Sequence, residues 1–218
     1  FKFIDLITSN ELTLVNLTAM QDPFEGVMLK EISIERVDLD GNPIKTSESE
    51  DSQLREVINK SVRKSLFISC WHENSCESAG MWDIYGNQKG IAIKTSVSKL
   101  KKAIRFDKIK EIDLLKINYY SGITDYFTPN IVENHIYTSM INKRKSFEHE
   151  REVRLIWHPR DYSNISPIRK IDIDLESLID IIYVSPFFDD WQLKSIEKLL
   201  KIMNINVAVQ KSQLYELQ

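Results

Sequence analysis

The segment from Lys143 to Arg154 contains charged residues that could act together in chemistry. If residues 150–157 form a strand, alternation of side chains places Glu150, Glu152 and Arg154 on one face. Successive charges on that face lie about 6.5–7 Å apart, close enough to converge on one small ligand. The apolar residues that alternate with them are Val153, Leu155 and Trp157. Two carboxylates beside a guanidinium suit acid–base catalysis or stabilisation of a cation, so this strand face is the first candidate site.

A solvated strand face with Glu–Arg ion pairs gives the same pattern, and such exposed pairs usually contribute little. Glu is depleted in strands, however, so two of them in line with an Arg favour a site. Both interpretations stay open at the level of the sequence.

Cys70, His72 and Cys76 lie close together in the sequence and are all possible zinc ligands. The sequence offers no fourth ligand at a spacing typical of structural zinc sites. Cys70 with His72 could also form a thiol nucleophile, but a buried cysteine is more often a small hydrophobic residue. We therefore expect no metal and no catalytic thiol.

Trp82 and Tyr85 have the spacing of neighbours on one helix face. Aromatic side chains at this spacing mostly pack against the rest of the protein, because they bury large areas. The alternative is that the two rings line a ligand pocket.

Length and composition favour one globular domain spanning residues 1–218. Hydrophobic residues make up 42% of the 218 residues and charged residues 28%, which are ordinary globular values. The formal charge of −3 lacks the basic excess of many nucleic-acid-binding proteins. Two cysteines, no visible signal peptide and no long apolar run predict a cytoplasmic protein that does not enter a membrane.

The spacing of apolar residues and turn residues predicts alternating helices and strands. Residues 38–52, which include Asp40-Gly41-Asn42-Pro43, are expected to form a mobile loop. The expected helices are near 4–7 and at 53–64, 80–85, 96–105 and 130–142, and the expected strands are at 12–17, 66–71, 91–95 and 114–120.

The C-terminal part gives the clearest pattern, with a strand at 181–185, a helix at 190–203 and a strand at 206–209. Asp189 and Gln192 are placed to cap this helix. Such a βαβ unit implies a parallel strand pair. The fold class we expect is α+β, with a mixed β-sheet and flanking helices.

Four groups of residues also give the chain a resemblance to a known family. They are Asp22-Pro23-Phe24-Glu25-Gly26; Ser69-Cys70-Trp71-His72 with Glu77-Ser78 and Met81-Trp82-Asp83-Ile84-Tyr85; Gly90-Ile91-Ala92-Ile93; and Lys143, Phe147 and Glu150-Arg151-Glu152-Val153-Arg154. In order and spacing, over roughly residues 1–160, they resemble the bacterial family known as domain of unknown function 2971.

The layout of this family is loosely similar to ADP-ribosyltransferase folds, which carry a late Glu-x-Glu strand. The resemblance implies that Glu152 bonds a ribose hydroxyl of NAD and stabilises the oxocarbenium-like state as nicotinamide leaves. It implies that Glu150 orients or deprotonates the acceptor. The residues expected to bind NAD are Arg154, Lys143, Trp82, Tyr85 and Ser69.

The function expected from this resemblance is that of an ADP-ribosyltransferase-like or NAD-cleaving enzyme, acting as a toxin or anti-phage effector. Its co-substrate would be NAD, and its partners a macromolecular acceptor or a defence protein. The alternatives are a non-catalytic module that senses a nucleotide or a protein in a defence system, and a metal-dependent nuclease that uses Glu150 and Glu152.

Overall fold

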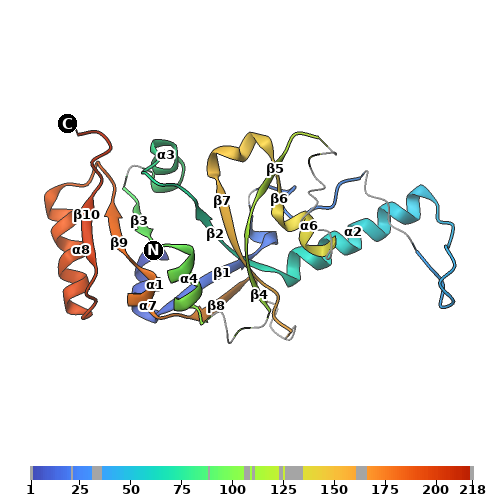
Figure 1. Cartoon of the computed structure of the whole chain (residues 1–218), viewed down its shortest axis with the longest axis horizontal. Coiled ribbons are helices and arrows are strands. Elements are labelled where there is room, and N and C mark those ends of the chain that lie inside the picture. The colour runs from blue at the N-terminus through green and yellow to red at the C-terminus, as the bar shows by residue number, and fades with distance from the viewer. Residues whose placement is uncertain are drawn as a thin grey trace. The chain divides into compact units, whose positions relative to one another are not determined.

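The computed structural model describes residues 2–20, 22–30, 36–87, 89–105, 109, 111–122, 125, 135–160 and 166–216 (Figure 1). The backbone divides into two compact units. Unit 1 comprises Phe1–Thr13, Glu73–Lys110 and Lys170–Gln218, and unit 2 comprises Leu14–His72 and Glu111–Arg169. Each unit combines helices with strands, so the predicted α+β class is confirmed. That the whole chain is one domain stays a prediction.

Strand β7 is an interior strand of the five-stranded sheet of unit 2. β7 (Glu152–Trp157) lies between β4 (Ile112–Lys116) and β2 (Phe67–His72) and is antiparallel to both. β1 (Glu11–Asn16) follows β2 and then β8 (Ile168–Asp172), and both of these strands have residues in both units. Buried side chains occur on both faces of β7, since Glu152, Arg154, Leu155 and Ile156 are all buried.

Smaller elements complete unit 2. Strands β5 (Asn118–Tyr120) and β6 (Asn142–Arg144) pair in parallel, and helix α6 (His135–Ile141) leads directly into β6. Short 3₁₀ helices η1 (Leu17–Ala19) and η2 (Lys145–Glu150) follow β1 and β6. The buried apolar core of these elements is Leu17, Leu66, Ile68, Ile117, Met140, Ile141 and Ile156.

Helix α2 (Glu48–Ser65) begins inside the segment expected to be a loop at 38–52. Ser47 accepts a hydrogen bond from the Glu50 N–H, and the Glu50 carboxylate accepts one from the Ser47 N–H, which forms a capping box. The loop prediction is therefore wrong for residues 48–52, because this cap starts the helix earlier than the apolar spacing indicated.

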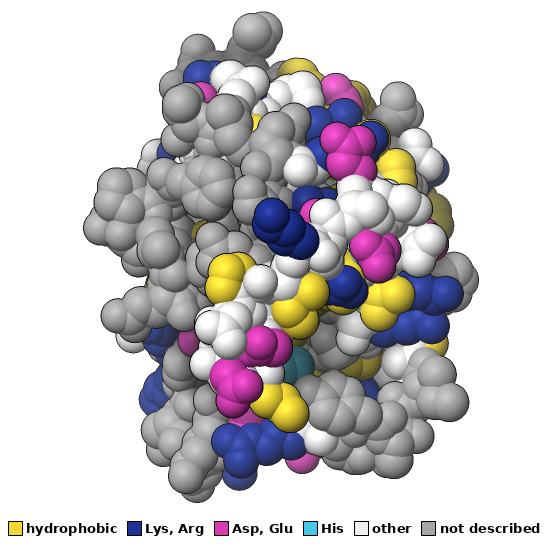
Figure 2. Space-filling view, turned by 90° about the vertical axis from the view of Figure 1, so that its right-hand side faces the viewer, with side chains coloured by type: hydrophobic (Ala, Val, Ile, Leu, Met, Phe, Trp, Pro, Cys, Tyr) yellow, Lys and Arg dark blue, Asp and Glu magenta, His cyan; other side chains and the backbone are white. Residues whose placement is uncertain are grey.

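No residue of α2 is buried. Figure 2 views the side on which α2 lies in Figure 1, and it shows basic and acidic side chains interspersed with hydrophobic ones. The helix is thus a surface element of unit 2. Val62 packs against the apolar core, and Arg55, Asn59 and Arg63 make hydrogen bonds to η1 and the segment that follows it.

The predicted single strand at 114–120 is wrong, because the chain changes sheets within it. β4 belongs to the main sheet and β5 to the two-stranded sheet. Between them, the buried Ile117 donates its backbone N–H to the carbonyl of Glu152 at 2.9 Å. Sequence periodicity does not detect such a change, since both strands have similar composition.

Unit 1 contains the predicted βαβ unit. β9 (Ile181–Val184), helix α8 (Asp190–Ile202) and β10 (Ala208–Lys211) follow one another, and β10 pairs with β9 in parallel. The predicted cap of α8 by Asp189 and Gln192 is present. The remaining elements are α1 (Lys2–Ser9), α3 (Ala79–Gly86), β3 (Ile91–Lys94), α4 (Val97–Ala103) and α7 (Leu175–Leu178).

The other predicted elements lie close to observed ones. The helix expected at 130–142 falls partly outside the described residues, and its described part is α6. None of the described helices is long and apolar enough to cross a membrane.

Candidate functional site

Glu152 and Arg154 share one face of β7, as predicted from strand alternation, and this face is buried. In the register with β2, Arg154 lies opposite Cys70 and Glu152 lies opposite His72. Arg154 is 0% exposed and Glu152 3%. The interpretation as a solvated strand face is therefore wrong for these two residues. Ion pairs at this depth are desolvated, so their charges must be matched by close partners.

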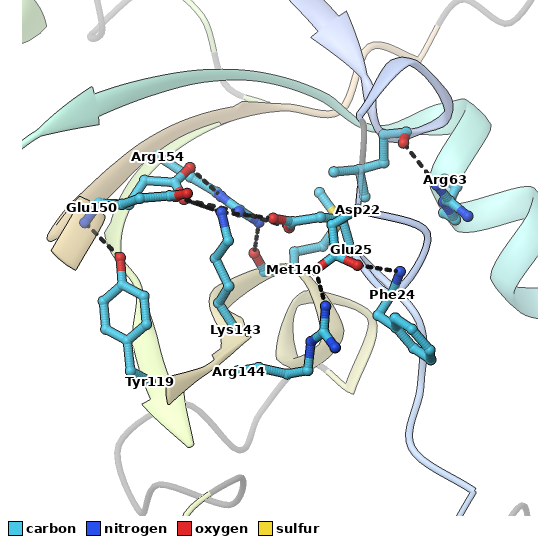
Figure 3. A network of polar contacts seen from close by, with 12 residues as sticks. Asp22, Phe24, Glu25, Arg63, Tyr119, Met140, Lys143, Arg144, Glu150 and Arg154 are labelled. Atoms are coloured by element: carbon cyan, nitrogen blue, oxygen red, sulfur yellow. Dashed lines mark hydrogen bonds and ion pairs between the residues drawn. The ribbon is translucent and has the colours of Figure 1, made fainter. Parts of the chain in front are cut away.

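The Arg154 guanidinium connects three parts of unit 2 (Figure 3). Its Nε donates to Glu152 Oε1 at 2.6 Å, and its Nη2 donates to Glu152 Oε2 at 3.0 Å. Nη2 also donates to Glu25 Oε2 at 2.7 Å, and Nη1 donates to the carbonyl of Met140, in α6, at 2.7 Å. This planar group fixes the two carboxylates and the end of α6 in one arrangement.

Glu25 comes from the loop that follows η1, far from β7 in the sequence. Its side chain is buried, and its Oε1 lies 2.9 Å from the ammonium of Lys143. Gly26 beside it has φ +69°, and a Cβ there would lie 2.3 Å from Leu17 Cδ1. Glycine is thus required both by the backbone angle and by the close approach of the loop to the core.

Lys143, in β6, gathers the carboxylates of the cluster. Its Nζ lies 2.5 Å from Glu150 Oε2, 2.9 Å from Glu25 Oε1 and 3.4 Å from Glu152 Oε2. The side chain is only 9% exposed. We call Glu25, Lys143, Glu150, Glu152 and Arg154 the charge cluster.

Glu150 joins the charge cluster from the 3₁₀ helix η2, whereas it was predicted to lie on the strand. It ends the 3₁₀ helix η2, and Arg151 then adopts a left-handed conformation with φ +41°, so β7 starts only at Glu152. The prediction that Glu150 lies on the strand is therefore wrong. The turn nevertheless directs its carboxylate to Lys143, and Glu150 is the more exposed of the two predicted carboxylates, at 11% against 4% for the side chain of Glu152.

The charge cluster comprises three carboxylate side chains and two basic side chains, which gives a formal net charge of −1. Burial opposes ionisation of Glu152, but the hydrogen bond and charge of Arg154, together with Lys143, lower its pKa. Burial likewise opposes the charge of Lys143, and hydrogen bonds to Glu150 and Glu25 outweigh this and raise its pKa. Both groups are therefore charged across the physiological pH range.

Two further groups border the charge cluster. The Tyr119 hydroxyl accepts the N–H of Glu152 at 2.8 Å, and the Nδ1 of His72 lies 2.6 Å from the carbonyl of Glu150. Because a carbonyl can only accept, this His72 Nδ1 carries a proton. These contacts fix the backbone on both sides of Arg151, where η2 gives way to β7.

Cys70 does not have the properties of a nucleophile. The residue is accessible to solvent, although protein atoms crowd its sulfur. This desolvation and the nearby Glu152 carboxylate raise the pKa of the thiol. The neutral thiol is a weak nucleophile, but Cys70 is exposed and so is not the buried hydrophobic residue preferred from the sequence.

The remaining predicted site residues belong to β2 and α3. Ser69 pairs with Leu155, so it projects from the face of the sheet opposite to Arg154. Trp82 and Tyr85 belong to α3 in unit 1, where Trp82 is buried and donates to Glu77 Oε2 at 2.9 Å. Tyr85 is exposed. Their predicted roles in NAD binding stay predictions.

Sequence reasoning did not assign Glu25 or Tyr119 to the site. Glu25 lies within the Asp22–Gly26 group, on which the family resemblance partly rests. Its position directly before a Gly in a turn was the feature of the sequence that could have assigned it to the site. Tyr119 had no such signal, because its position depends on the pairing of β5 with β6.

No group of three or more His, Cys, Asp or Glu side chains suited to a metal ion occurs among the residues that the structure describes. In the charge cluster, Lys143 and Arg154 occupy the space between the carboxylates. The arrangement can therefore hold cationic or polar groups against carboxylates.

Residues 81–155 match the sequence profile of a family described as "Protein of unknown function (DUF2971)". The resemblance to domain of unknown function 2971 is confirmed over this stretch, which contains Lys143, Glu150, Glu152 and Arg154. The groups at residues 22–26 and 69–72 lie outside the match. Searches of curated proteins and of solved structures each gave no significant match.

Proposed function

We propose that this protein cleaves the N-glycosidic bond of NAD, as an ADP-ribosyltransferase-like or NAD-cleaving enzyme. The observation that supports this proposal is the convergence of three carboxylates, with a net charge of −1, in a buried cluster whose edge reaches the surface at Glu150. A fixed negative charge in a place of low dielectric stabilises a cationic transition state more strongly than water does.

In the proposed reaction, the bond between ribose C1′ and the nicotinamide nitrogen breaks, and its electron pair leaves with nicotinamide. The positive charge that develops on C1′ and the ring oxygen is the same problem that glycosidases solve with carboxylates. Water or an acceptor group then bonds to C1′ and loses a proton.

The geometry favours the role first expected of Glu150 but a different role for Glu152. Both oxygens of Glu152 bond to Arg154 and the side chain is buried, so Glu152 acts through its charge rather than by contact. Glu150, at the outer edge, is the group placed to accept the proton of the attacking water or acceptor. Lys143 holds the two carboxylates at a fixed separation.

The test is release of nicotinamide from NAD by the wild type, Glu150→Gln, Glu152→Gln and the control Glu148→Gln. Glu148 lies in the same 3₁₀ helix as Glu150 and its side chain is exposed. We expect Glu150→Gln to lower kcat by about 10²- to 10⁴-fold, the usual contribution of a general base. Glu148→Gln should leave kcat unchanged.

Far-UV circular dichroism and thermal melting of each variant separate lost chemistry from lost folding. Release at the background rate by a folded wild type, equal to that of Glu150→Gln, would rule out NAD as the substrate of this site.

A module that senses a nucleotide or a protein without turnover is the second candidate. It is supported by the many ion pairs that the cluster residues make with one another, so the cluster holds together without a ligand. Binding of NAD without release of nicotinamide would favour this function. By analogy with ADP-ribosyltransferase folds, we also propose a biological role. If the protein cleaves NAD, it is a toxin or anti-phage effector. If it binds without turnover, it is a sensor in a defence system.

A further inference from the structure

Arg144 directly follows Lys143, but its side chain lies at the surface beside two phenylalanine rings. Its Cζ is 4.8 Å from the ring centroid of Phe24 and 5.2 Å from that of Phe147. Arg144 is 44% exposed at its side chain and Phe24 is 60% exposed. We call Asp22, Phe24, Arg144 and Phe147 the aromatic rim.

Asp22 gives the aromatic rim a fixed geometry. Its Oδ2 accepts a hydrogen bond from Arg144 Nη2 at 3.0 Å, and its Oδ1 accepts one from the backbone N–H of Phe24 at 3.0 Å. Arg144 and Phe24 are thereby attached to the same carboxylate (Figure 3). The guanidinium and the ring are held side by side before any ligand arrives, which lowers the entropic cost of binding.

The aromatic rim adjoins the charge cluster through Phe147. The Phe147 ring contacts the ammonium of Lys143, with Nζ 4.9 Å from the centroid, as well as the guanidinium of Arg144. A ligand that spans the aromatic rim and the charge cluster therefore meets the guanidinium of Arg144 at one end and the net negative charge of the cluster at the other. NAD has matching charges, because its phosphates are anionic and its nicotinamide ring is cationic.

The chemistry of the rim fits the nucleoside phosphate part of such a ligand. An exposed aromatic ring stacks on any nucleobase, since every base has a π-face. A guanidinium has five N–H donors and can bind a phosphate while it keeps its pair with Asp22. Phe24 is 60% exposed, so part of its ring is open to a ligand although Arg144 packs against it.

We propose that the aromatic rim binds a nucleoside phosphate, with the base stacked on Phe24 and the phosphate paired with Arg144. The identity of the complete ligand as NAD rests on the proposed function. The binding itself does not, because it requires only a base and a phosphate.

The experiment is calorimetric titration with adenosine monophosphate (AMP) and with adenosine, neither of which carries a nicotinamide. The proteins are the wild type, Phe24→Ala, Phe24→Tyr, Arg144→Gln and the control Lys145→Gln, whose exposed charge lies next to Arg144 in the sequence. The melting temperature of each variant establishes that it is folded.

Phe24→Ala should weaken binding of both ligands by about 5- to 100-fold, as for the loss of one base-stacking contact, and Phe24→Tyr should preserve it. Arg144→Gln should weaken binding of AMP but not of adenosine, and only the AMP affinity should fall as salt is added. Lys145→Gln should bind like the wild type.

The proposal is overturned if the folded wild type does not bind AMP at millimolar concentration. It is also overturned if Phe24→Ala and Arg144→Gln bind AMP as tightly as the wild type does. Because AMP cannot release nicotinamide, AMP binding at the rim without cleavage of NAD would refute the proposed function alone. Cleavage of NAD by the wild type, together with unchanged AMP affinity in Phe24→Ala and Arg144→Gln, would refute the rim alone.

Discussion

At the scale of single residues, Arg154 determines the arrangement of the charge cluster. One side chain bonds Glu152 on its own strand, Glu25 on a distant loop and the carbonyl of Met140. Only a planar group with several donors can make these contacts at once, because an ammonium presents three donors from a single nitrogen. The identity of this residue as Arg, and not merely its charge, is therefore a structural requirement.

We predict that Arg154→Lys and Arg154→Met each lower the free energy of unfolding by about 3–5 kcal/mol, the usual cost of leaving buried charges without their partner. Urea unfolding followed by circular dichroism measures this. The control is Arg160→Met, which removes a side chain that is 83% exposed and paired with Glu111. It should cost less than about 1 kcal/mol. An Arg154→Lys variant as stable as the wild type would show that charge alone suffices.

At the scale of elements, helix α2 holds the loop that carries Glu25. Arg63 donates from Nη1 to the carbonyl of Pro23 at 3.1 Å and from Nη2 to that of Leu17 at 3.0 Å. Asn59 accepts the backbone N–H of Met28 at 3.0 Å further along the same loop. An exposed helix thus sets the position of a carboxylate that it does not touch directly.

We predict that Arg63 and Glu25 are energetically coupled although they do not form an ion pair with each other. In a double-mutant cycle on the free energy of unfolding, Arg63→Ala and Glu25→Gln should be non-additive by about 0.5–3 kcal/mol, because a displaced loop no longer brings Glu25 to Arg154 and Lys143.

The same cycle with Lys64→Ala, an exposed residue of α2, serves as the control and should be additive within about 0.5 kcal/mol. Additive effects of Arg63→Ala and Glu25→Gln would mean that Arg63 stabilises α2 without positioning the site.

At the scale of the whole molecule, the buried charges make stability depend on pH. The folded-state pKa of Glu152 lies below its ordinary value of 4.5, so its stabilising contribution is fully present above pH 4.5 and is lost as the pH falls through the folded value. The pKa of Lys143 is raised from 10.5, so its contribution is fully present below that value and is lost only in stronger alkali. Between these limits both groups stabilise the fold.

We predict that Glu152→Gln flattens the acid side of the stability profile. Below pH 4.5 the wild type loses stability as Glu152 takes up a proton on unfolding, and the variant lacks this proton. The slope of the free energy of unfolding against pH should therefore fall by up to about 1.4 kcal/mol per pH unit. Urea unfolding at several values between about pH 3 and pH 7 measures it, and identical slopes would contradict the pKa assignment.

Much of the local structure follows from the sequence. The βαβ unit at the C-terminus, the cap of α8 and the shared face of Glu152 and Arg154 all come from side-chain periodicity and short-range hydrogen bonds. Predictions failed where the backbone turns. β4 ends and β5 begins around Ile117, and a left-handed Arg151 moves Glu150 off the strand. Such turns are fixed by tertiary hydrogen bonds, which periodicity does not encode.

The sequence by itself determined that the segment around residues 143–154 brings opposite charges close together, because alternation along a strand is a local property of the chain. Only the tertiary structure decided that these charges are buried, that Glu25 joins them and that Glu150 forms the outer edge. The reason is physical: burial and partnership depend on which distant segments cover β7. Here the loop of Glu25, the end of α6 and strand β6 supply that cover.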